Sequence, residues 1–591
     1  MKRHVSLVVL LAVAAGYLVA VNDQWATKSD SALYVGLGRA LAEGRGMIFN
    51  GQAQWGAPPV VPLVLAGCRL LVGPHYWLPN LLMSVAGLGV VILAWATARQ
   101  AATVLPRPWR DGVALGTLVI VGTSARLFID STILMTDVPC TLFLLAGVYA
   151  LLRWRDRPAM AYPALAAAML VATLTRIPAL VFAVGLGAAA AMDAWRRPRR
   201  WRALGLLAAS GAAAGLLFLW WAVAVRSRTD PGSADYLAAE YLGLFNLLSA
   251  EKWVLIGRAL VRLPDAVTSS IVYQKLSWFG LVPIGLILVG WWRLARRRQW
   301  ALVAPAVAHL GLLVVLGIVA SRYLLPIMPL LALAMLVGLL EVTTPLRRRL
   351  ARAAHRMARR AKADGHAGPG RRLVRLGRRI AIVAVPAAVV LCASISLPKI
   401  GREVYWMRHP DFYRVFDGGR WRSFQALADH LRRRADPATD RCLAPVGSVV
   451  HYWSGVVCRS TIHWQGKRHL HLADLPPEDF ARFAAASPFT FLAVPMDKGA
   501  WSTQTAAAMG TTGAFEPDVT RVGTFALFRR APSRRAKAAG RLSPRPKRPA
   551  SAVGGHGLCR TRYPTRYAID TTTVEKFCVN VLHVSRSRPS P

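Results

Sequence analysis

Long apolar runs, separated by short polar connections, set the pattern of this chain. Eleven of them predict membrane-spanning helices, each near the roughly 20 residues that a helix needs to cross a bilayer. They lie at residues 5–21, 76–98, 112–129, 137–152, 159–175, 177–194, 203–225, 278–292, 301–320, 324–342 and 379–397. The apolar region 159–194 has to fold back on itself, and Pro178 favours a break there. The pattern therefore predicts a mainly α, polytopic membrane helical bundle.

A long, mostly uncharged loop at residues 22–75 follows the first apolar run. That run comes after a basic start and could be a cleaved signal peptide, but no convincing small-x-small cleavage site follows it, so we favour an uncleaved first span. Within the loop, the apolar piece 60–72 is short and contains Pro62 and Arg69. It predicts a helix that lies in the membrane interface rather than a further span.

The pattern changes after residue 399. Between residues 400 and 531, short apolar β-prone runs alternate with amphipathic helical patterns. Strands are predicted within 441–447, 455–464, 489–496 and 522–530, and helices within 424–435 and 478–486. These elements predict a small C-terminal α/β domain at residues 400–531, after a transmembrane domain at residues 1–399.

Two cysteines, Cys442 and Cys458, lie on the first two predicted strands of this domain. In an oxidising compartment they could form a disulfide, and two buried thiols are the alternative. Residues 532–591 begin with a stretch rich in Pro, Ser, Arg and Lys and show no clear period. They predict a basic disordered tail.

The net charge of +45 reflects 74 Lys and Arg residues against 29 Asp and Glu residues. Excess positive charge can indicate nucleic-acid binding, but here it lies in every second connection between apolar runs, including 196–202, 293–298 and 347–379. Positive connections stay on the cytoplasmic side of a membrane. We therefore expect a multi-pass protein of the cytoplasmic (inner) membrane, with a cytoplasmic N-terminus, an extracytoplasmic C-terminal domain, the lipid bilayer as its environment and no nucleic-acid partner.

The ionisable residues at the outer ends of the predicted spans are candidates for function, because charges at the membrane edge are costly and are usually paired or functional. They are Asp30, Asp130, Asp137, Arg176 and Arg322. Acids and arginines from separate connections on one face predict a site that holds an anionic group and supplies a carboxylate base.

The first of these acids begins the stretch DSALYVGLGRALAEG at residues 30–44. Asp30, Tyr34, Leu37 and Leu41 recur at helical spacing, so they share one face of a short amphipathic helix. A purely structural interpretation is that Asp30 caps this helix by accepting its first free N–H groups. The functional interpretation is that the carboxylate faces a pocket.

The other candidates also have structural interpretations. Asp137 could cap the helix that Pro139 begins. Arg176 could extend its charged end to the membrane surface while its stem stays in the apolar region. Arg322 and Tyr323 could together anchor a helix at the interface. Taken singly these interpretations are sufficient, but the concentration of charge on one face favours a site.

Four motifs together resemble a known family. They are DSALYVGLGRALAEG at 30–44, WGAPP at 55–59, TDVPCTLFLL at 136–145 and SRYLLPIMPLLALAML at 321–336. Over residues 5–400 the chain resembles the GT-C fold glycosyltransferases that use polyprenyl-phosphate sugars, among them the protein O-mannosyltransferases and the lipid A aminoarabinose transferases. The chain departs from the latter before its double proline, where Gly56 and Ala57 replace an acidic and a basic residue.

The resemblance implies roles for individual residues. It makes Asp30 and Asp137 catalytic, and it makes Arg176 a contact of the donor phosphate. Arg322 and Tyr323 resemble the late basic-aromatic pair of the family and, with Tyr34, are expected to bind substrate: the donor-phosphate and substrate-binding set is Arg176, Arg322, Tyr323 and Tyr34. The sequence assigns no cofactor with certainty and leaves a divalent metal ion open.

The function that the resemblance implies is inverting transfer of a sugar from a polyprenyl-phosphate-linked donor to a lipid, glycan or protein acceptor. The charges suit it: arginine forks can stabilise the departing phosphate, and Asp30 could act as base towards an acceptor hydroxyl. Two alternatives stay open, a transporter or flippase of lipid-linked sugar and a non-catalytic membrane scaffold. The first would favour an internal repeat with broken helices, which this sequence lacks.

Overall fold

The structure is a computed structural model, and its described part lies between residues 2 and 531. It comprises residues 2–26, 29–54, 57–105, 107–226, 250–272, 274, 280–363, 370–408, 420–444, 446–460, 462–465, 468–471, 476–487, 489–495, 504–505, 507–509, 514–522 and 525–531. The predicted tail at 532–591 lies outside the described residues.

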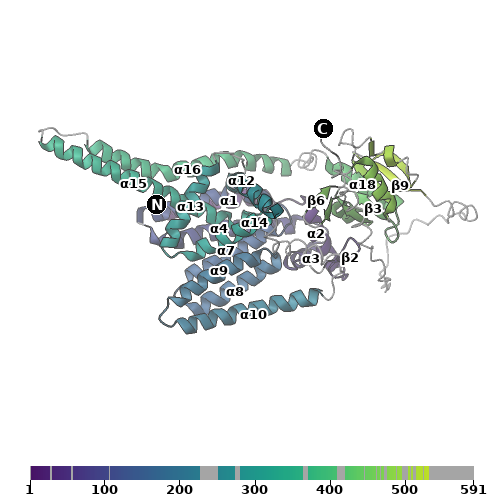
Figure 1. The fold of residues 1–591 in the computed structure, drawn as a ribbon, viewed down its shortest axis with the longest axis horizontal. Coiled ribbons are helices and arrows are strands. Elements are labelled where there is room, and N and C mark those ends of the chain that lie inside the picture. Colours follow the sequence, from purple (N-terminus) through teal and green to yellow (C-terminus); the bar gives the residue numbers. More distant parts are fainter. Residues whose placement is uncertain are drawn as a thin grey trace, which may run out of the picture. The chain divides into compact units, whose positions relative to one another are not determined.

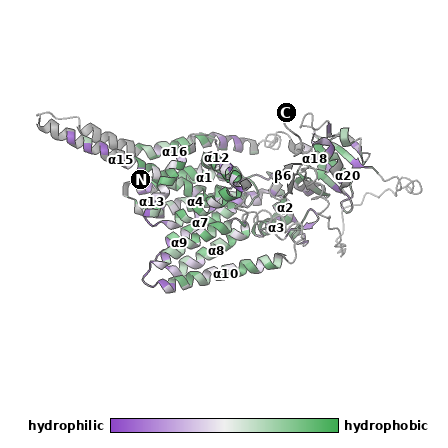
Figure 2. Cartoon of the chain, in the orientation of Figure 1, coloured by the Kyte–Doolittle hydropathy of each residue, from purple (hydrophilic) through white to green (hydrophobic). Residues whose placement is uncertain are grey.

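A helix covers the greater part of each predicted span (Figure 1). In chain order they are α1 (Lys2–Val19), α4 (Trp77–Ala101), α5 (Arg107–Gly122), α7 (Asp137–Arg153), α8 (Pro158–Thr175), α9 (Ala179–Trp195), α10 (Arg200–Arg226), α13 (Leu281–Arg296), α14 (Trp300–Leu316), α15 (Met328–Ala363) and α16 (Gly370–Arg408). Between α10 and α13 the described residues add α12 (Ala250–Val272). Apolar residues line most of the length of α7, α8, α9 and α10 (Figure 2).

Length and hydropathy single out five of the described helices as able to cross a bilayer. They are Trp77–Ala101, Pro158–Thr175, Arg200–Ala224, Leu325–Pro345 and Val383–Tyr405. Shorter apolar helices include His4–Val19, Ala179–Trp195 and Trp300–Leu316. The chain is therefore a membrane protein, and the number of eleven spans stays a prediction.

One predicted span, 112–129, is divided in the structure. Helix α5 ends at Gly122, and the short helix α6 (Ala125–Asp130) begins after Ser124. The Ser124 hydroxyl accepts a hydrogen bond from the backbone N–H of Leu127, which is the usual side-chain cap at a helix start. The apolar composition of the run hid this break, because a capping serine contributes little to hydropathy.

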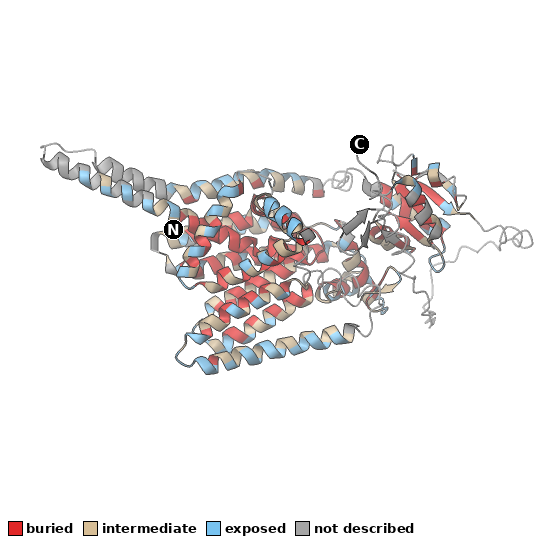
Figure 3. Ribbon diagram, viewed as in Figure 1, coloured by how far each residue is buried: buried red, intermediate tan, exposed pale blue. Residues whose placement is uncertain are grey.

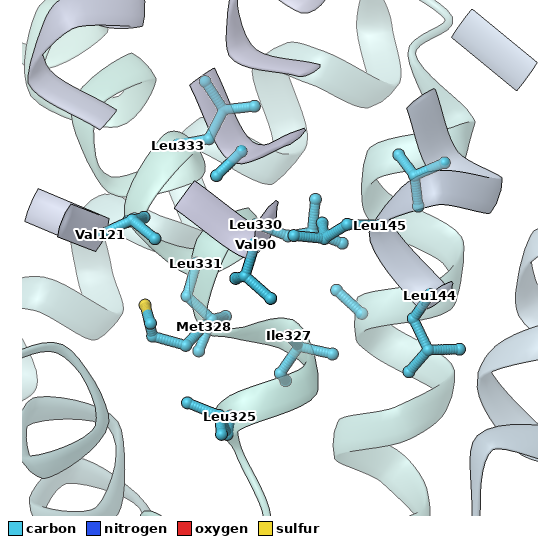
Figure 4. Packing of buried hydrophobic residues seen from close by; sticks show 14 of the residues in the cluster. Val90, Val121, Leu144, Leu145, Leu325, Ile327, Met328, Leu330, Leu331 and Leu333 are labelled. Carbon is cyan, nitrogen blue, oxygen red and sulfur yellow. The ribbon is translucent and has the colours of Figure 1, made fainter. Parts of the chain in front are cut away.

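The centre of the helical bundle is the first part of α15. The segment Leu325–Pro345 begins with the 3-10 turn η4 (Leu325–Ile327), and 83% of the residues in its apolar 18-residue stretch are buried. Its side chains pack among residues of α4, α5 and α7, including Val90, Val121 and Leu144, all close to fully buried (Figure 4). In contrast, α10 is largely exposed along its length (Figure 3). Because Arg322 lies just before this central helix, the core fixes the position of that arginine.

Two glycines let α13 and α15 approach each other backbone to backbone. A Cβ atom added at Gly290 would overlap the carbonyl group of Ala334, and one added at Gly338 would overlap the carbonyl of Leu286. Small residues at such crossings are the usual means by which membrane helices pack closely. The close approach explains why these two glycines lie in otherwise large apolar helices.

We expect Gly290→Val to destabilise the protein by about 1–3 kcal/mol or more, because the new side chain has to push two backbones apart. The measurement is the melting temperature of the protein purified in a neutral detergent. Gly285→Val is the matched control on the same helix, since a Cβ there meets no atom within 4 Å. Equal melting temperatures for the two variants would contradict this account of the packing.

The predicted outer loop contains more regular structure than its composition suggested. It holds helix α2 (Ser29–Ala42), a hairpin of β1 (Ile48–Phe49) and β2 (Gln52–Ala53), and helix α3 (Val60–Val72). Helix α3 coincides with the predicted interface helix at 60–72, and its Leu70 and Leu71 are exposed. An apolar exposed face of this kind suits a helix at a membrane surface.

The C-terminal part of the chain forms a five-stranded mixed sheet in the order β4-β3-β7-β9-β8. The strands are β3 (Arg441–Ala444), β4 (Val457–Ser460), β7 (Phe491–Pro495), β8 (Phe515–Val522) and β9 (Phe525–Arg530), with a separate hairpin of β5 (Ile462–Gln465) and β6 (Arg468–His471). The helices are α18 (Arg420–Arg434), α19 (Gly447–Ser454) and α20 (Pro477–Ala486). The sequence predicted α18, α20, β3, β7 and β9. The single strand predicted within 455–464 is two strands, β4 and β5, in separate sheets, and α19, β6 and β8 were not predicted.

The two cysteines of this sheet lie directly opposite each other. Cys442 on β3 pairs in register with Cys458 on β4, and both are buried free thiols. A hydrogen bond with Cys458 and burial raise the pKa of the Cys442 thiol well above its usual range. Of the two alternatives that the sequence left open, the structure contains the unbridged one.

A side chain of the outer loop forms hydrogen bonds with the edge strand of this sheet. The Asn50 amide donates to the carbonyl oxygen of Cys458 at 2.6 Å and accepts from the Cys458 backbone N–H at 2.8 Å. The backbone N–H of Asn50 donates to Nε2 of His451 at 2.9 Å. Asn50 therefore takes the hydrogen bonds that a further strand would make with β4.

Candidate functional site

Four charged side chains from four separate connections meet at one end of the helical bundle. Asp30 lies in the first turn of α2, Asp137 begins α7, Arg176 follows α8, and Arg322 lies between α14 and η4. Arg322 donates from Nη2 to Oδ2 of Asp30 at 2.8 Å and from Nε to Oδ2 of Asp137 at 3.1 Å. Arg176 pairs through Nη1 with Oδ1 of Asp137. The structure thus brings together four of the five ionisable residues that the sequence singled out at this face.

The exposure of these side chains changes steadily across the cluster. Asp137 is 2% exposed, Arg176 14%, Arg322 25% and Asp30 50%. Both oxygens of the buried Asp137 carboxylate are paired with arginine, as a buried charge requires. Asp30 has the most exposed carboxylate of the four-residue cluster. Of the two acids predicted to be catalytic, Asp30 is therefore the accessible one, and Asp137 is buried between the two arginines.

Local backbone structure explains these positions. Asp137 occupies the first turn of α7, where the helix dipole favours a carboxylate. Helix α8 ends at Thr175, Arg176 is extended, and Pro178 precedes the start of α9, so Arg176 sits in the break predicted within 159–194. Helix α14 ends at Leu316, and the next residue, Gly317, has the left-handed conformation with φ of 73°. A glycine in this conformation ends the helix, and the connection that carries Arg322 follows it.

The Tyr323 ring lies beside both guanidinium groups. The Cζ atom of Arg176 is 5.3 Å from the ring centroid, and that of Arg322 is 5.8 Å away. Such contacts offset part of the repulsion between two neighbouring cations. Burial, and to a lesser extent the charge of Arg322, lowers the pKa of Arg176, but an arginine stays protonated in proteins. The two guanidinium groups therefore keep a double positive charge at the site.

The other aromatic candidate, Tyr34, joins α2 to the start of α7. Its side chain is partly buried, and its hydroxyl shares a hydrogen bond with the side chain of Thr136. Burial raises the pKa of Tyr34 above its usual value, so its hydroxyl remains protonated at neutral pH. Tyr34 contributes a neutral hydroxyl beside the charged groups and fixes the helix that carries Asp30.

The structural interpretations of the two acids do not account for these contacts. The cap position of α7 is Thr136, which makes no side-chain capping bond, and both Asp137 oxygens are paired with arginine. Asp30 bonds to Arg322, which is 292 residues away in the chain. The cluster therefore does more than terminate two helices.

One candidate does not join the cluster. Asp130 forms a two-bond pair with Arg126 on its own helix α6, at 2.7 and 2.8 Å. Two supporting residues, Thr136 and His309, were not predicted from the sequence. His309 on α14 donates from Nε2 to the backbone carbonyl of Tyr323 at 2.9 Å and so holds the connection that carries Arg322. A histidine inside an apolar helix was the available signal for it.

The described residues contain no group of three or more His, Cys, Asp and Glu side chains arranged to hold a metal ion. Within the cluster, both carboxylates are bonded to arginine rather than facing each other. The chemistry that this arrangement offers is binding of an anionic group by two guanidiniums, next to a half-exposed carboxylate.

A scan against protein-family models gave no match, and a sequence search of curated proteins gave none either. Solved structures do match. ArnT from Cupriavidus metallidurans bound to undecaprenyl phosphate is similar over 89% of this chain and 98% of its own, with 14% identity and a TM-score of 0.51. The archaeal oligosaccharyltransferase AglB from Archaeoglobus fulgidus, in complex with an inhibitory peptide and a dolichol-phosphate, is similar over 90% of this chain and 74% of its own, with 10% identity and a TM-score of 0.52.

At these levels of identity the similarity concerns the fold. It extends over 89% of this chain for ArnT and 90% for AglB. The resemblance to the GT-C fold that the four sequence motifs predicted is thereby confirmed.

Proposed function

We propose that this protein is a membrane glycosyltransferase that moves a sugar from a polyprenyl-phosphate-linked donor to a lipid, glycan or protein acceptor at the outer face of the cytoplasmic membrane. The observation that carries the proposal is the position of Arg322, which bonds to a half-exposed Asp30 and a buried Asp137 together. Two structures with the same fold contain a polyprenyl-type phosphate, undecaprenyl phosphate in one and dolichol-phosphate in the other.

The arginines suit the leaving group of this reaction. A polyprenyl-phosphate sugar is a phosphate diester with one negative charge, and the departing polyprenyl phosphate gains a second charge as the bond between the sugar C1 and the phosphate oxygen breaks. Arg322 uses Nε and one N–H of Nη2 for the two carboxylates, and its other N–H groups have no hydrogen bond to the described residues. A guanidinium has five N–H groups in a planar fork. Arg322 can therefore bind a phosphate oxygen without releasing Asp137, and Arg176 adds charge beside it.

Asp30 suits the other half of the reaction. When a phosphate binds Arg322, it competes with the Asp30 carboxylate for the same guanidinium, which would free Asp30 to accept the proton of an acceptor hydroxyl. The bond from C1 to the phosphate oxygen breaks while the bond from C1 to the acceptor oxygen forms. The proton passes to Asp30, and the electron pair leaves with the phosphate. One displacement of this kind inverts the anomeric centre.

The same proposal places the parts of the chain relative to the membrane. The cluster lies on the side opposite the most basic connections, so the N-terminus is cytoplasmic and residues 22–75 and 400–531 are extracytoplasmic. Residues 1–399 form the transmembrane domain, 400–531 form the α/β domain, and 532–591 form the basic tail.

The experiment is a transfer assay with the purified protein in vesicles, using an undecaprenyl-phosphate sugar labelled in the sugar and an envelope extract as the source of acceptor. We expect the label to appear in a new glycosidic linkage of opposite anomeric configuration, with release of one undecaprenyl phosphate per sugar moved. Label that crosses the vesicle membrane with its donor intact would instead identify a transporter. Donor that is neither cleaved nor carried across the membrane would contradict both the glycosyltransferase and the transporter.

A further inference from the structure

A second set of arginines lies at the opposite ends of the helices that carry the candidate active site. A cavity there is lined by Arg155, Arg196 and Arg298, together with Asp193, Gln299 and Trp300. The three arginines come from three separate turns, which connect α7 to α8, α9 to α10 and α13 to α14. Segments far apart in sequence therefore converge on one positively charged cavity.

The one carboxylate that lines this cavity is already occupied. Asp193 accepts from Arg155 through Oδ1 at 3.0 Å, and from Arg197 through Oδ2 at 2.8 Å. Arg196 and Arg298 form no ion pair with any of the described residues. Three lining arginines against one lining carboxylate leave a formal charge of +2. The cavity thus has an excess of positive charge that no described acid neutralises.

One hydrogen-bond donor in the lining of this cavity lacks an acceptor. The indole Nε1 of Trp300 is buried without a hydrogen-bond partner among the described residues. A buried donor without an acceptor is rare, because it loses its bonds to water and gains none. Guanidinium and indole N–H groups only donate. A negatively charged ligand rich in acceptor oxygens would therefore satisfy this indole and the unpaired arginines of the lining.

Exposed tryptophans surround this end of the bundle. Trp195, Trp201 and Trp292 are each at least half exposed. The guanidinium of Arg200 lies 5.1 Å from the ring centroid of Trp195, and that of Arg296 lies 4.5 Å from that of Trp292. Exposed tryptophans beside arginines mark the level at which a membrane protein meets the lipid headgroups. A basic pocket between membrane helices at that level is a known type of site for anionic lipid headgroups.

We propose that this cavity binds the phosphate of an anionic membrane lipid, through Arg196, Arg298 and the Trp300 indole. The site is separate from the candidate active site. Helix α7 has 17 residues, with Asp137 as its first and Arg153 as its last, so the two sites are about 25 Å apart at a rise of about 1.5 Å per residue. The lipid would bridge the turns at the ends of α7, α9 and α14, and it would hold these three helices together from the side opposite the catalytic groups.

The test is native mass spectrometry of the full chain, delipidated in a neutral detergent and then given phosphatidylglycerol, phosphatidylcholine or inorganic phosphate. We expect bound phosphatidylglycerol and little bound phosphatidylcholine. The double variant Arg196→Gln with Arg298→Gln should bind phosphatidylglycerol about tenfold more weakly or worse. The matched control, Arg199→Gln with Arg297→Gln, removes the same charge from the same two turns, but neither residue lines the cavity.

Without lipid, the wild type and the two double variants should have the same melting temperature, which would show that both variants fold. Added phosphatidylglycerol should raise the melting temperature of the wild type and of the control variant, but not that of Arg196→Gln with Arg298→Gln. Equal lipid binding by both double variants would overturn the site. Equal binding of the two lipids would overturn the requirement for an anionic headgroup. Binding of inorganic phosphate without binding of lipid would overturn the lipid as the source of the phosphate.

Discussion

An Asp30→Asn variant should lose sugar transfer by about 10²–10⁴-fold, the usual contribution of a positioned general base. The amide oxygen of Asn can still accept a hydrogen bond from Arg322, so the variant can keep the hydrogen bond that spans 2.8 Å in the wild type. What the substitution removes is the negative charge and the ability to take a proton. The measurement is the turnover number of the purified variant with a saturating polyprenyl-phosphate sugar, after its amount in the membrane is shown to match the wild type.

The matched control is Glu43→Gln. Glu43 follows α2 in the same loop and pairs with Arg39 and Arg45, away from the cluster. It should keep turnover near that of the wild type, because it removes one carboxylate charge from the same loop without touching the site. Full turnover by Asp30→Asn would exclude Asp30 as the base.

The second large effect concerns the donor. We expect Arg322→Gln to lower kcat/KM for the donor by about 10²–10³-fold, as expected for the loss of a group that stabilises charge developing in the transition state. Arg176→Gln should act in the same direction and mainly on donor binding. Each single variant leaves Asp137 with one arginine partner, Arg176 or Arg322, so the buried carboxylate still has an ion pair.

Initial rates measured over a range of donor and acceptor concentrations test this. The substitution should lower kcat/KM for the donor and leave the KM for the acceptor nearly unchanged. Arg45→Gln is the control, because Arg45 is an exposed arginine of the same outer loop that pairs with Glu43 rather than with the cluster. Donor kinetics in Arg322→Gln that equal those of Arg45→Gln would remove Arg322 from the phosphate site.

Much of the helical part of this fold could be predicted from sequence, because a membrane helix satisfies its own backbone hydrogen bonds and its apolar length is a local property. The prediction for α3 matches its observed ends, Val60 and Val72. The break after α5 was missed because it depends on one serine cap at Ser124. Strand β8 was missed because its sequence, FEPDVTRV, is polar and its pairing with β9 is irregular.

The charged residues of the site were predictable for a related reason. Carboxylates and arginines at the ends of apolar runs are few, so Asp30, Asp137, Arg176 and Arg322 stand out singly. Their pairing was not predictable, since it depends on how distant connections meet. Asp130 illustrates the difference: its partner Arg126 lies four residues earlier, and this local helical pair takes it out of the site.

The contacts that hold the site in place were the least visible in the sequence. Thr136 and His309 are single polar residues beside or within apolar helices, and nothing local reveals that one meets Tyr34 and the other the backbone of Tyr323. The hydrogen bonds of Asn50 with Cys458 join residues 408 positions apart. Such contacts follow from the assembled fold rather than from periodicity.

The central claim is that Asp30, Asp137, Arg176 and Arg322 form the binding site of a polyprenyl phosphate. Structure determination of the protein with undecaprenyl phosphate, by electron cryomicroscopy in a lipid nanodisc, tests it most directly. We expect the phosphate within hydrogen-bond distance of the Arg322 guanidinium and beside Arg176, with the Asp30 carboxylate displaced from Arg322. A phosphate bound elsewhere, while Arg322 still joins Asp30 to Asp137, would contradict the claim.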